Sequence, residues 1–114
     1  MRRYDAMNAG NLRHRVTILR KITDTDTDGY PVEEWVAVAT VWAAVEPIAG
    51  REYFQAAAVQ AEHQTRFTMR YRADITPDMR LHYDGQDYEI KGQPRDLGGW
   101  RRWLEIMGEV VTGG

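Results

Sequence analysis

A strict alternation of side chains over residues 63–72 limits the possible folds of this chain more than any other feature. Phe67, Met69 and Tyr71 fall on odd positions, and the even positions carry glutamine, threonine or arginine. Successive residues of a β-strand point to opposite faces of a sheet, so this period of two predicts a strand with one apolar and one basic face. The apolar face must be covered, which implies a sheet wrapped around a core.

The other strand signals are short and are separated by turn residues. Residues 12–20 alternate in the same way, and residues 35–45 are rich in Val, Trp and Ala, which predicts one or two strands buried on both faces with a bulge near Ala39. Asp84 and Gly85 predict a tight hairpin turn, because this pair readily adopts positive φ angles. The strands predicted around that turn are 80–83 and 87–90, and the last predicted strand is 103–110.

One segment favours a helix instead. Residues 50–62 have the best helix propensity in the chain, with three consecutive alanines, but their apolar stripe is thin. Pro47 ends the preceding strand, so this helix would fall inside a connection of about twenty residues, a length that compact domains rarely carry unless it has a function. We therefore regard the excursion over residues 46–62 as the most informative segment.

Together these signals predict a mainly β fold. We expect a small antiparallel β-barrel or sandwich of five to six strands, with one short α-helix inside a long loop. With 114 residues, the chain has room for one domain, 1–114. We expect its ends, 1–10 and 111–114, to be flexible.

Composition argues against most catalytic functions. The chain contains no cysteine and no serine, so it lacks thiolate metal ligands and two common nucleophiles. No phosphate-binding loop or dinucleotide fingerprint occurs. We therefore expect no enzymatic activity and no cofactor. The net charge of −2 gives no support to a reader of duplex DNA.

The sequence gives no indication of a membrane or export segment. The longest apolar stretch, 36–45, is interrupted by Thr40 and is too short to span a bilayer. Residues 1–5 include two arginines but are not followed by an apolar stretch, so they do not form a signal peptide. We expect a protein that stays in, or is assembled in, a cytoplasm.

An acidic segment resembles the start of a calcium-binding loop. Asp24, Asp26 and Asp28 precede Gly29 with the required spacing, but Trp35 stands where the bidentate glutamate belongs. We interpret this segment as a solvated hairpin tip. The histidines also lack ligand-like spacing, so we expect no metal site from them and regard them as partly buried or interface side chains: His14, His63 and His82.

Two groups of arginines are candidates for a subunit or partner interface. Arg66, Arg70 and Arg72 share the basic face of the predicted strand, whereas Phe67 and Tyr71 lie on the opposite face. Binding of a single-stranded nucleic acid needs both kinds of residue on one face, so we favour a polar surface or a subunit contact over such binding. The second candidate group combines tryptophan with arginine, as interface hot spots do: Trp100, Arg101 and Arg102.

The order of these features resembles the head-tail joining (head completion, or stopper) proteins of tailed bacteriophages, prophages and gene transfer agents. The resemblance covers roughly residues 9–111, and its most specific part is WAAVEPIAGREYF at 42–54. The other matching segments are LRHRVTIL (12–19), DGYPVEEW (28–35), HQTRFTMRYR (63–72), ITPDMRL (75–81) and YDGQDYEI (83–90). The segment 100–103 departs most from the family pattern.

The resemblance implies a small β-barrel that assembles into a ring, a dodecamer, at the neck of the virion. The ring would sit between the portal and adaptor proteins and the tail terminator or tail tube, close the DNA exit channel after packaging and receive the tail. DNA would pass through without sequence-specific binding, and no membrane would be involved. The runner-up functions are another neck or tail ring component (adaptor or tail terminator) and a single-stranded nucleic-acid-binding barrel.

The resemblance also assigns a role to the excursion over residues 46–62. In such proteins a long loop with a short helix is the element associated with the channel. The candidates for channel lining or gating here are Glu46, Arg51, Glu52, Tyr53 and Phe54.

Overall fold

Seven antiparallel strands make up nearly all regular structure in the computed structural model, which describes residues 9–48 and 64–111. A short 3-10 turn, η2 (Ala9–Asn11), precedes them. The strands are β1 (His14–Thr25), β2 (Pro31–Pro47), β3 (Gln64–Arg70), β4 (Arg80–Tyr83), β5 (Gln86–Ile90), β6 (Arg95–Leu97) and β7 (Trp103–Val110). The prediction of a mainly β, antiparallel fold is therefore confirmed.

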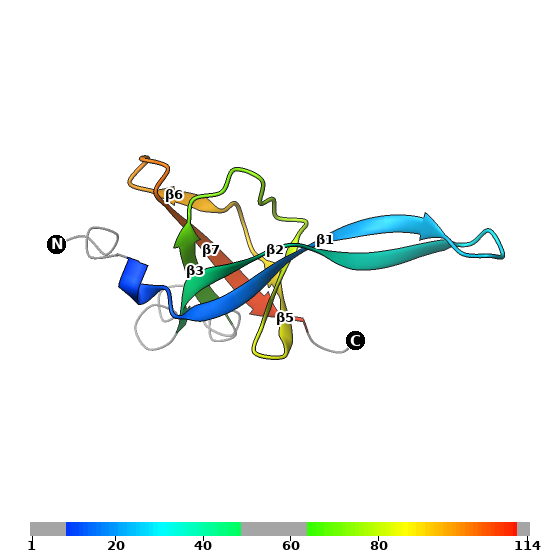
Figure 1. The fold of residues 1–114 in the computed structure, drawn as a ribbon, viewed down its shortest axis with the longest axis horizontal. Helices are drawn as coiled ribbons and strands as arrows, with labels where there is room; N and C mark the ends of the chain where they lie inside the picture. Colours follow the sequence, from blue (N-terminus) through cyan, green and yellow to red (C-terminus); the bar gives the residue numbers. More distant parts are fainter. Residues whose placement is uncertain (1–8, 49–63, 112–114) are drawn as a thin grey trace.

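The strand pairings return to their starting point. The order along the sheet is β3-β2-β1-β4-β5-β7-β6, and β3 also pairs with β7. Six strands therefore have a hydrogen-bonded neighbour on both sides: β1, β2, β3, β7, β5 and β4. The short strand β6 pairs with β7 on the same edge as β5, farther along β7. We call this circuit of strands the body (Figure 1).

The core of the body is built by the alternation seen in the sequence. Phe67 and Met69 are fully buried, as predicted, and they pack with Ile18, Leu81 and Ile106 from three other strands. The Phe67 ring meets the ring of Tyr88 edge to face, with centroids 5.1 Å apart. Edge-to-face contacts of this kind add stability beyond the buried area.

The predicted hairpin between β4 and β5 is confirmed. Tyr83 pairs with Gln86, and the two residues between them, Asp84 and Gly85, have φ angles of 53° and 78°. These angles match the turn whose twist suits a two-residue hairpin, which is why an Asp-Gly pair stands there.

The first two strands extend far beyond the body and form what we call the arm, residues 20–36 (Figure 1). The arm gives the described part of the chain its long axis, with extents of 58 × 31 × 23 Å. A register shift between Ile18 and Leu19 leaves Val38 as an extra residue in β2. This bulge lies one residue from the position predicted at Ala39.

Several expectations need correction. Seven strands replace the expected five to six, because β6 is a separate short strand. Most of β2 is exposed or half-buried rather than buried on both faces, since its first half lies in the arm. The helix predicted over 50–62 falls outside the described residues, and the described ranges contain no α-helix. Within those ranges no helix is long and apolar enough to cross a bilayer.

Candidate functional site

The strands that flank the predicted excursion meet at its base. Pro47 of β2 pairs with Thr65 of β3, and the amide of Ile48 donates a 2.9 Å hydrogen bond to the carbonyl of Gln64. Ile48 itself is buried. The two described residues that flank 49–63 therefore lie next to each other at the end of the β2–β3 ladder.

Glu46 lies inside β2, not in the loop where the sequence placed it. It pairs with Arg66 across the β2–β3 ladder, and a Glu46 carboxylate oxygen lies 4.0 Å from an Arg66 nitrogen. The strand continues past Glu46 because β3 supplies a hydrogen-bonded partner as far as Thr65. The other four gating candidates lie outside the described residues: Arg51, Glu52, Tyr53 and Phe54.

Arg66 is half-buried instead of lying on an open basic face. Its Nε atom lies 3.2 Å from Oε2 of Glu105, a β7 carboxylate whose side chain is only 4% exposed. Arg95 approaches the other oxygen of Glu105 at 3.4 Å. A buried carboxylate needs partners of this kind. Arg66 therefore compensates the charge of Glu105 and is not available as part of an open basic surface.

The remaining interface candidates come together at one end of the body. The amide of Tyr71 donates a 3.0 Å hydrogen bond to the carbonyl of Arg102, which joins the end of β3 to the segment before β7. Arg101 has a φ of 56°, and its amide donates to the carboxylate of Asp96. Trp100 is 59% exposed, whereas Trp103 is buried, so the two tryptophans of this segment have different roles.

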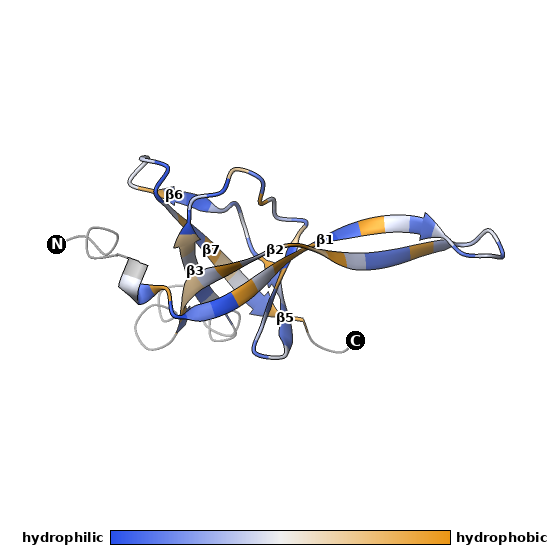
Figure 2. Ribbon diagram, viewed as in Figure 1, coloured by the Kyte–Doolittle hydropathy of each residue, from blue (hydrophilic) through white to orange (hydrophobic). Residues whose placement is uncertain are grey.

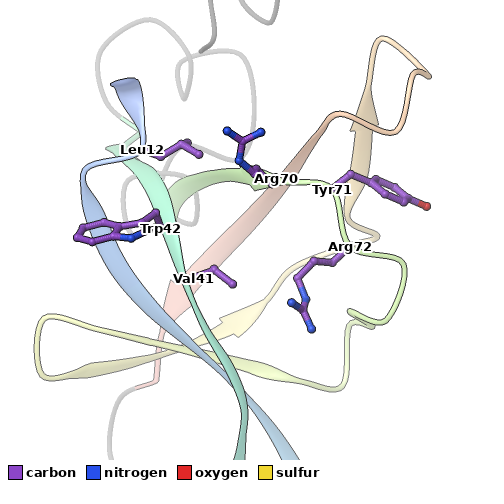
Figure 3. A pocket seen from close by; sticks show the side chains of 6 residues that line it. All are labelled: Leu12, Val41, Trp42, Arg70, Tyr71 and Arg72. Carbon is purple, nitrogen blue, oxygen red and sulfur yellow. The ribbon is translucent and has the colours of Figure 1, made fainter. Parts of the chain in front are cut away.

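A groove of roughly 330 Å³ opens at this end of the body (Figure 3). Its apolar surface comes from Leu12, Val41, Trp42 and Tyr71, and its charge comes from Arg70 and Arg72.

The arginines of this groove are held in place. Arg72 donates two hydrogen bonds, at 2.9 and 3.1 Å, to the carboxylate of Asp74, and these bonds hold the pKa of Asp74 below its usual value. Arg70 lies over the ring of the buried Trp103, at 5.5 Å from its centroid. Arg15 lies 4.7 Å from the centroid of the exposed Trp42 ring and extends the positive charge along this surface.

The facing argument made from the sequence holds for the core contact of Tyr71 but does not account for the groove that Tyr71 also borders. β3 ends at Arg70, so Tyr71 and Arg72 lie beyond the strand. Tyr71 packs against the core that holds Phe67, as the facing argument expects, and it also borders the groove that Arg70 and Arg72 line.

The acidic segment forms the tip of the arm, in agreement with our interpretation. One carboxylate oxygen of Asp26 accepts hydrogen bonds of 2.9 Å from the amides of Asp28 and Tyr30, and the amide of Gly29 donates to the Asp26 carbonyl. Asp26 thus organises the turn, a common role for an aspartate in a tight loop. In the described ranges no group of three or more acidic or histidine side chains could hold a metal ion.

Two of the three histidines make local contacts. Nδ1 of His14 lies 3.1 Å from the Tyr83 hydroxyl, and Nδ1 of His82 lies 2.6 Å from a carboxylate oxygen of Asp87. His63 lies outside the described residues.

Comparison with known families decides the assignment. The model of the phage head completion protein family matches residues 7–111, nearly the whole chain. The chain belongs to this family. The predicted resemblance is thus confirmed, and with it the prediction of a bacteriophage virion protein, whose expected location at the neck is consistent with the family.

Individual relatives agree with this membership. The head completion protein gp16 of Bacillus phage SPP1 is 28% identical over 94 residues, which cover 82% of this chain and 86% of the relative. Protein SF1141 of Shigella flexneri 2a, solved in solution, is 31% identical, with a TM-score of 0.79 over 95% of this chain and all of that protein. A chain of the virion of a native gene transfer agent particle shares the fold, with a TM-score of 0.57 and 16% identity over 90% of this chain and 97% of that one.

The arm is the feature of this head completion protein that sequence reasoning missed. The acidic run from Asp24 to Pro31 was interpreted as a loop, yet only residues 26–30 turn, and both strands continue to the tip. Ile22 and Val32 were the available signal, since apolar residues on both sides of a short turn indicate a long hairpin.

Proposed function

We propose that this head completion protein forms a ring, of twelve copies, at the neck of the virion, where it closes the DNA exit channel after packaging and receives the tail. Its partners in this proposal are further copies of itself, the portal and adaptor proteins above, and the tail terminator or tail tube below. It acts through assembly and not through catalysis. We infer that the circuit of strands serves as a small barrel that carries the segments working in the channel.

The observation that best supports a channel role is the base of residues 49–63. Ile48 and Gln64 are hydrogen-bonded neighbours, although fifteen residues separate them. A compact hairpin would need only two to five residues to join these strand ends. The described residues alone pair β2 with β3 as far as Ile48 and Gln64, so a role outside this pairing accounts best for the additional length.

The charge of the chain is compatible with the passage of DNA. A net charge of −2 gives little general attraction for phosphate. Strong binding of many phosphates would hold the DNA in the channel, because each neutralised phosphate adds to the affinity.

The experiment replaces residues 50–62 with a four-residue Gly/Asn linker and tests whether the variant restores a phage that lacks the gene. We expect a folded protein with a cooperative unfolding transition, and particles that lose packaged DNA or fail to join tails. A control replaces the same residues with a Gly/Ser segment of equal length, which separates the length of the segment from its side chains. Particles that keep their DNA and join tails with the short linker would overturn the channel role.

An adaptor or tail-terminator role would place the ring elsewhere along the neck. Electron microscopy of particles carrying a labelled copy of the chain measures this directly. A ring found next to the portal, or within the tail, would favour these alternatives.

A second candidate function is binding of a single-stranded nucleic acid, and the groove is the observation that favours it. Trp42 and Tyr71 lie in the same groove as Arg70 and Arg72, the combination of aromatic and basic residues that such binding uses. Titration with a fluorescent oligo-dT at two salt concentrations tests it. Binding that weakens at higher salt, and that is lost in Arg70→Gln/Arg72→Gln, would support this function.

A further inference from the structure

β1 continues from the body into the arm, so the side of the strand that faces the core in the body extends past the core. Val16 and Ile18 are fully buried in the body, and the alternation of the strand places Arg20, Ile22 and Asp24 on the same side. No register shift interrupts β1 after Leu19, so this side runs on to the tip.

The bulge in β2 keeps its apolar residues on that same side. Ile18 pairs with Ala39, but beyond Val38 the pairs are Arg20 with Val36 and Ile22 with Glu34. Residues paired directly across an antiparallel ladder share a face. The side of the arm that continues from the core therefore holds Arg20, Ile22, Asp24, Val32, Glu34 and Val36.

The apolar side chains on this face of the arm are incompletely covered: Ile22 and Val36 are half-buried, and Val32 is exposed. Val32 is 42% exposed, and Tyr30, next to it at the turn, is 68% exposed. Figure 2 shows separate apolar patches, interrupted by hydrophilic residues, on both strands of the arm. Burying such side chains against a partner would be favourable, whereas leaving them in water gives no stabilisation.

Both edges of the arm also lack partners among the described residues. β1 pairs with β4 only over residues 17–19, and β2 pairs with β3 only from Ala43 onward. An isolated two-stranded hairpin is marginally stable in water. A long hairpin with an exposed apolar face is therefore expected to dock on another surface.

The groove at the other end of the body offers complementary chemistry. In Figure 3, β1 and β2 leave the view away from the groove, so arm and groove lie at opposite ends of the molecule (Figures 1 and 3). The arm has five carboxylates and two basic side chains. The groove presents Arg70 and Arg72, of which Arg72 is already paired with Asp74, beside the exposed ring of Trp42. Apolar surface can thus meet apolar surface while Asp24 and Glu34 of the arm meet the arginines.

We propose that the arm of one copy docks in the groove of the next copy, head to tail. Two different patches in contact repeat around a rotation axis, which is how a closed ring is built. This inference rests on the proposed ring and names the surfaces that join its subunits. The occupant of the groove is the acidic arm of a second copy of this chain.

The test captures the contact by cross-linking, which works because the chain has no cysteine of its own. One protein carries Thr27→Cys at the tip of the arm, and an isotopically labelled protein carries Asn11→Cys beside the groove residue Leu12. The two are mixed at high concentration and joined with a short bismaleimide, and mass spectrometry counts the mixed and the like pairs. A matched control replaces Asn11→Cys with Gln86→Cys, an exposed position at the start of β5.

Charge reversal shows whether the contact is the proposed one. We expect the mixed product to exceed that of the Gln86→Cys control about threefold or more, since two surface ion pairs contribute roughly 0.2–1 kcal/mol each. Asp24→Lys/Glu34→Lys in the arm protein, or Arg70→Glu/Arg72→Glu in the groove protein, should each abolish the excess. Combining the reversed arm with the reversed groove should restore it. Thermal unfolding of each variant shows that it is folded.

A mixed product equal to the control with the unaltered charges would overturn the arm–groove contact. So would an excess that survives both charge reversals. Oligo-dT binding in the groove together with control-level cross-linking would assign the groove to nucleic acid instead. Because these measurements use the purified protein, the contact can fail while the effect of shortening residues 50–62 on particles still stands.

Discussion

The guanidinium of Arg80 lies over the ring of Trp35, with 4.3 Å between its central carbon and the ring centroid. Arg80 belongs to β4 of the body and Trp35 to the arm, and the ammonium of Lys21 approaches the same ring at 5.7 Å. The contact lies where the arm leaves the body, just beyond the pairing of Leu19 with Arg80. It therefore helps to hold the arm in its orientation relative to the body. In the proposed ring, this orientation would determine how the arm reaches the neighbouring subunit.

Removing this ring should loosen the arm without unfolding the body. Cation–π contacts at partly exposed sites contribute about 0.5–1 kcal/mol each. For Trp35→Ala we expect amide hydrogen exchange to accelerate about threefold to tenfold over residues 20–36, with β3 and β7 unchanged. Trp42→Ala is the matched control, because Trp42 also lies under an arginine but outside the arm. Equal acceleration in both variants would contradict the role of Trp35.

The buried carboxylate of Glu105 should be important for stability. Its side chain is 4% exposed, and that of its partner Arg66 is 16% exposed. Glu105→Gln removes the buried charge closest to Arg66 and leaves the more exposed Glu46 at 4.0 Å, which we expect to lower the free energy of unfolding by about 3 kcal/mol in urea denaturation. Arg95→Ala is the control, since the Arg95 side chain is 72% exposed and its loss should cost less than about 1 kcal/mol. A loss for Arg95→Ala as large as that for Glu105→Gln would show that Arg66 is not the main partner.

Gly108 of β7 is required by the close approach of two aromatic residues. A Cβ atom there would lie 2.9 Å from Cε1 of Phe67 and 3.1 Å from Cβ of Tyr88. We expect Gly108→Ala to destabilise the protein by about 1–3 kcal/mol, measured by thermal and urea unfolding. Because one of the contacts is to the Phe67 ring, Phe67→Leu should cost less in the Gly108→Ala background than in the wild type. Simple additivity of the two losses would contradict this packing explanation.

The Arg72–Asp74 pair gives a stability contribution that depends on pH. The hydrogen bonds from Arg72 lower the pKa of Asp74 in the folded protein, so the contribution is present above the unfolded value near 3.8 and is lost as the pH falls through the folded value. We expect Asp74→Asn to be slightly less stable than the wild type at pH 7, with the difference disappearing in acid. Urea unfolding from pH 7 to pH 2.5 measures this. A difference that grows in acid would reverse the sign and contradict the argument.

The sequence reveals local structure best where the period and the turn chemistry agree. Phe67 and Met69 are buried on the face that the period of two predicts, although Thr68 on the opposite face of β3 is fully buried as well. Asp84 and Gly85 turn where predicted, since few other residues accept positive φ angles. The same reasoning places Tyr71 on the core side, where it is partly buried, but it does not reveal that Tyr71 also borders the groove beyond the end of β3.

The site residues are predicted less well, because their environment comes from strands distant in the sequence. Arg66 has the spacing of an exposed strand residue, yet its partner Glu105 lies on β7. The groove likewise combines Leu12, Trp42 and Arg70 from three separate segments. No local pattern relates these residues.

The sequence by itself determined that the chain is a mainly β, antiparallel protein with an unusually long connection between two strands, and it carried the family signature. These properties follow from local alternation, turn residues and composition. Only the tertiary structure decided that the connection begins after Ile48, that Arg66 faces a buried carboxylate, and that β1 and β2 continue into an arm. Such features depend on which strand supplies the next hydrogen-bonded neighbour and on where that neighbour ends, and this information is set by contacts between segments far apart in the chain.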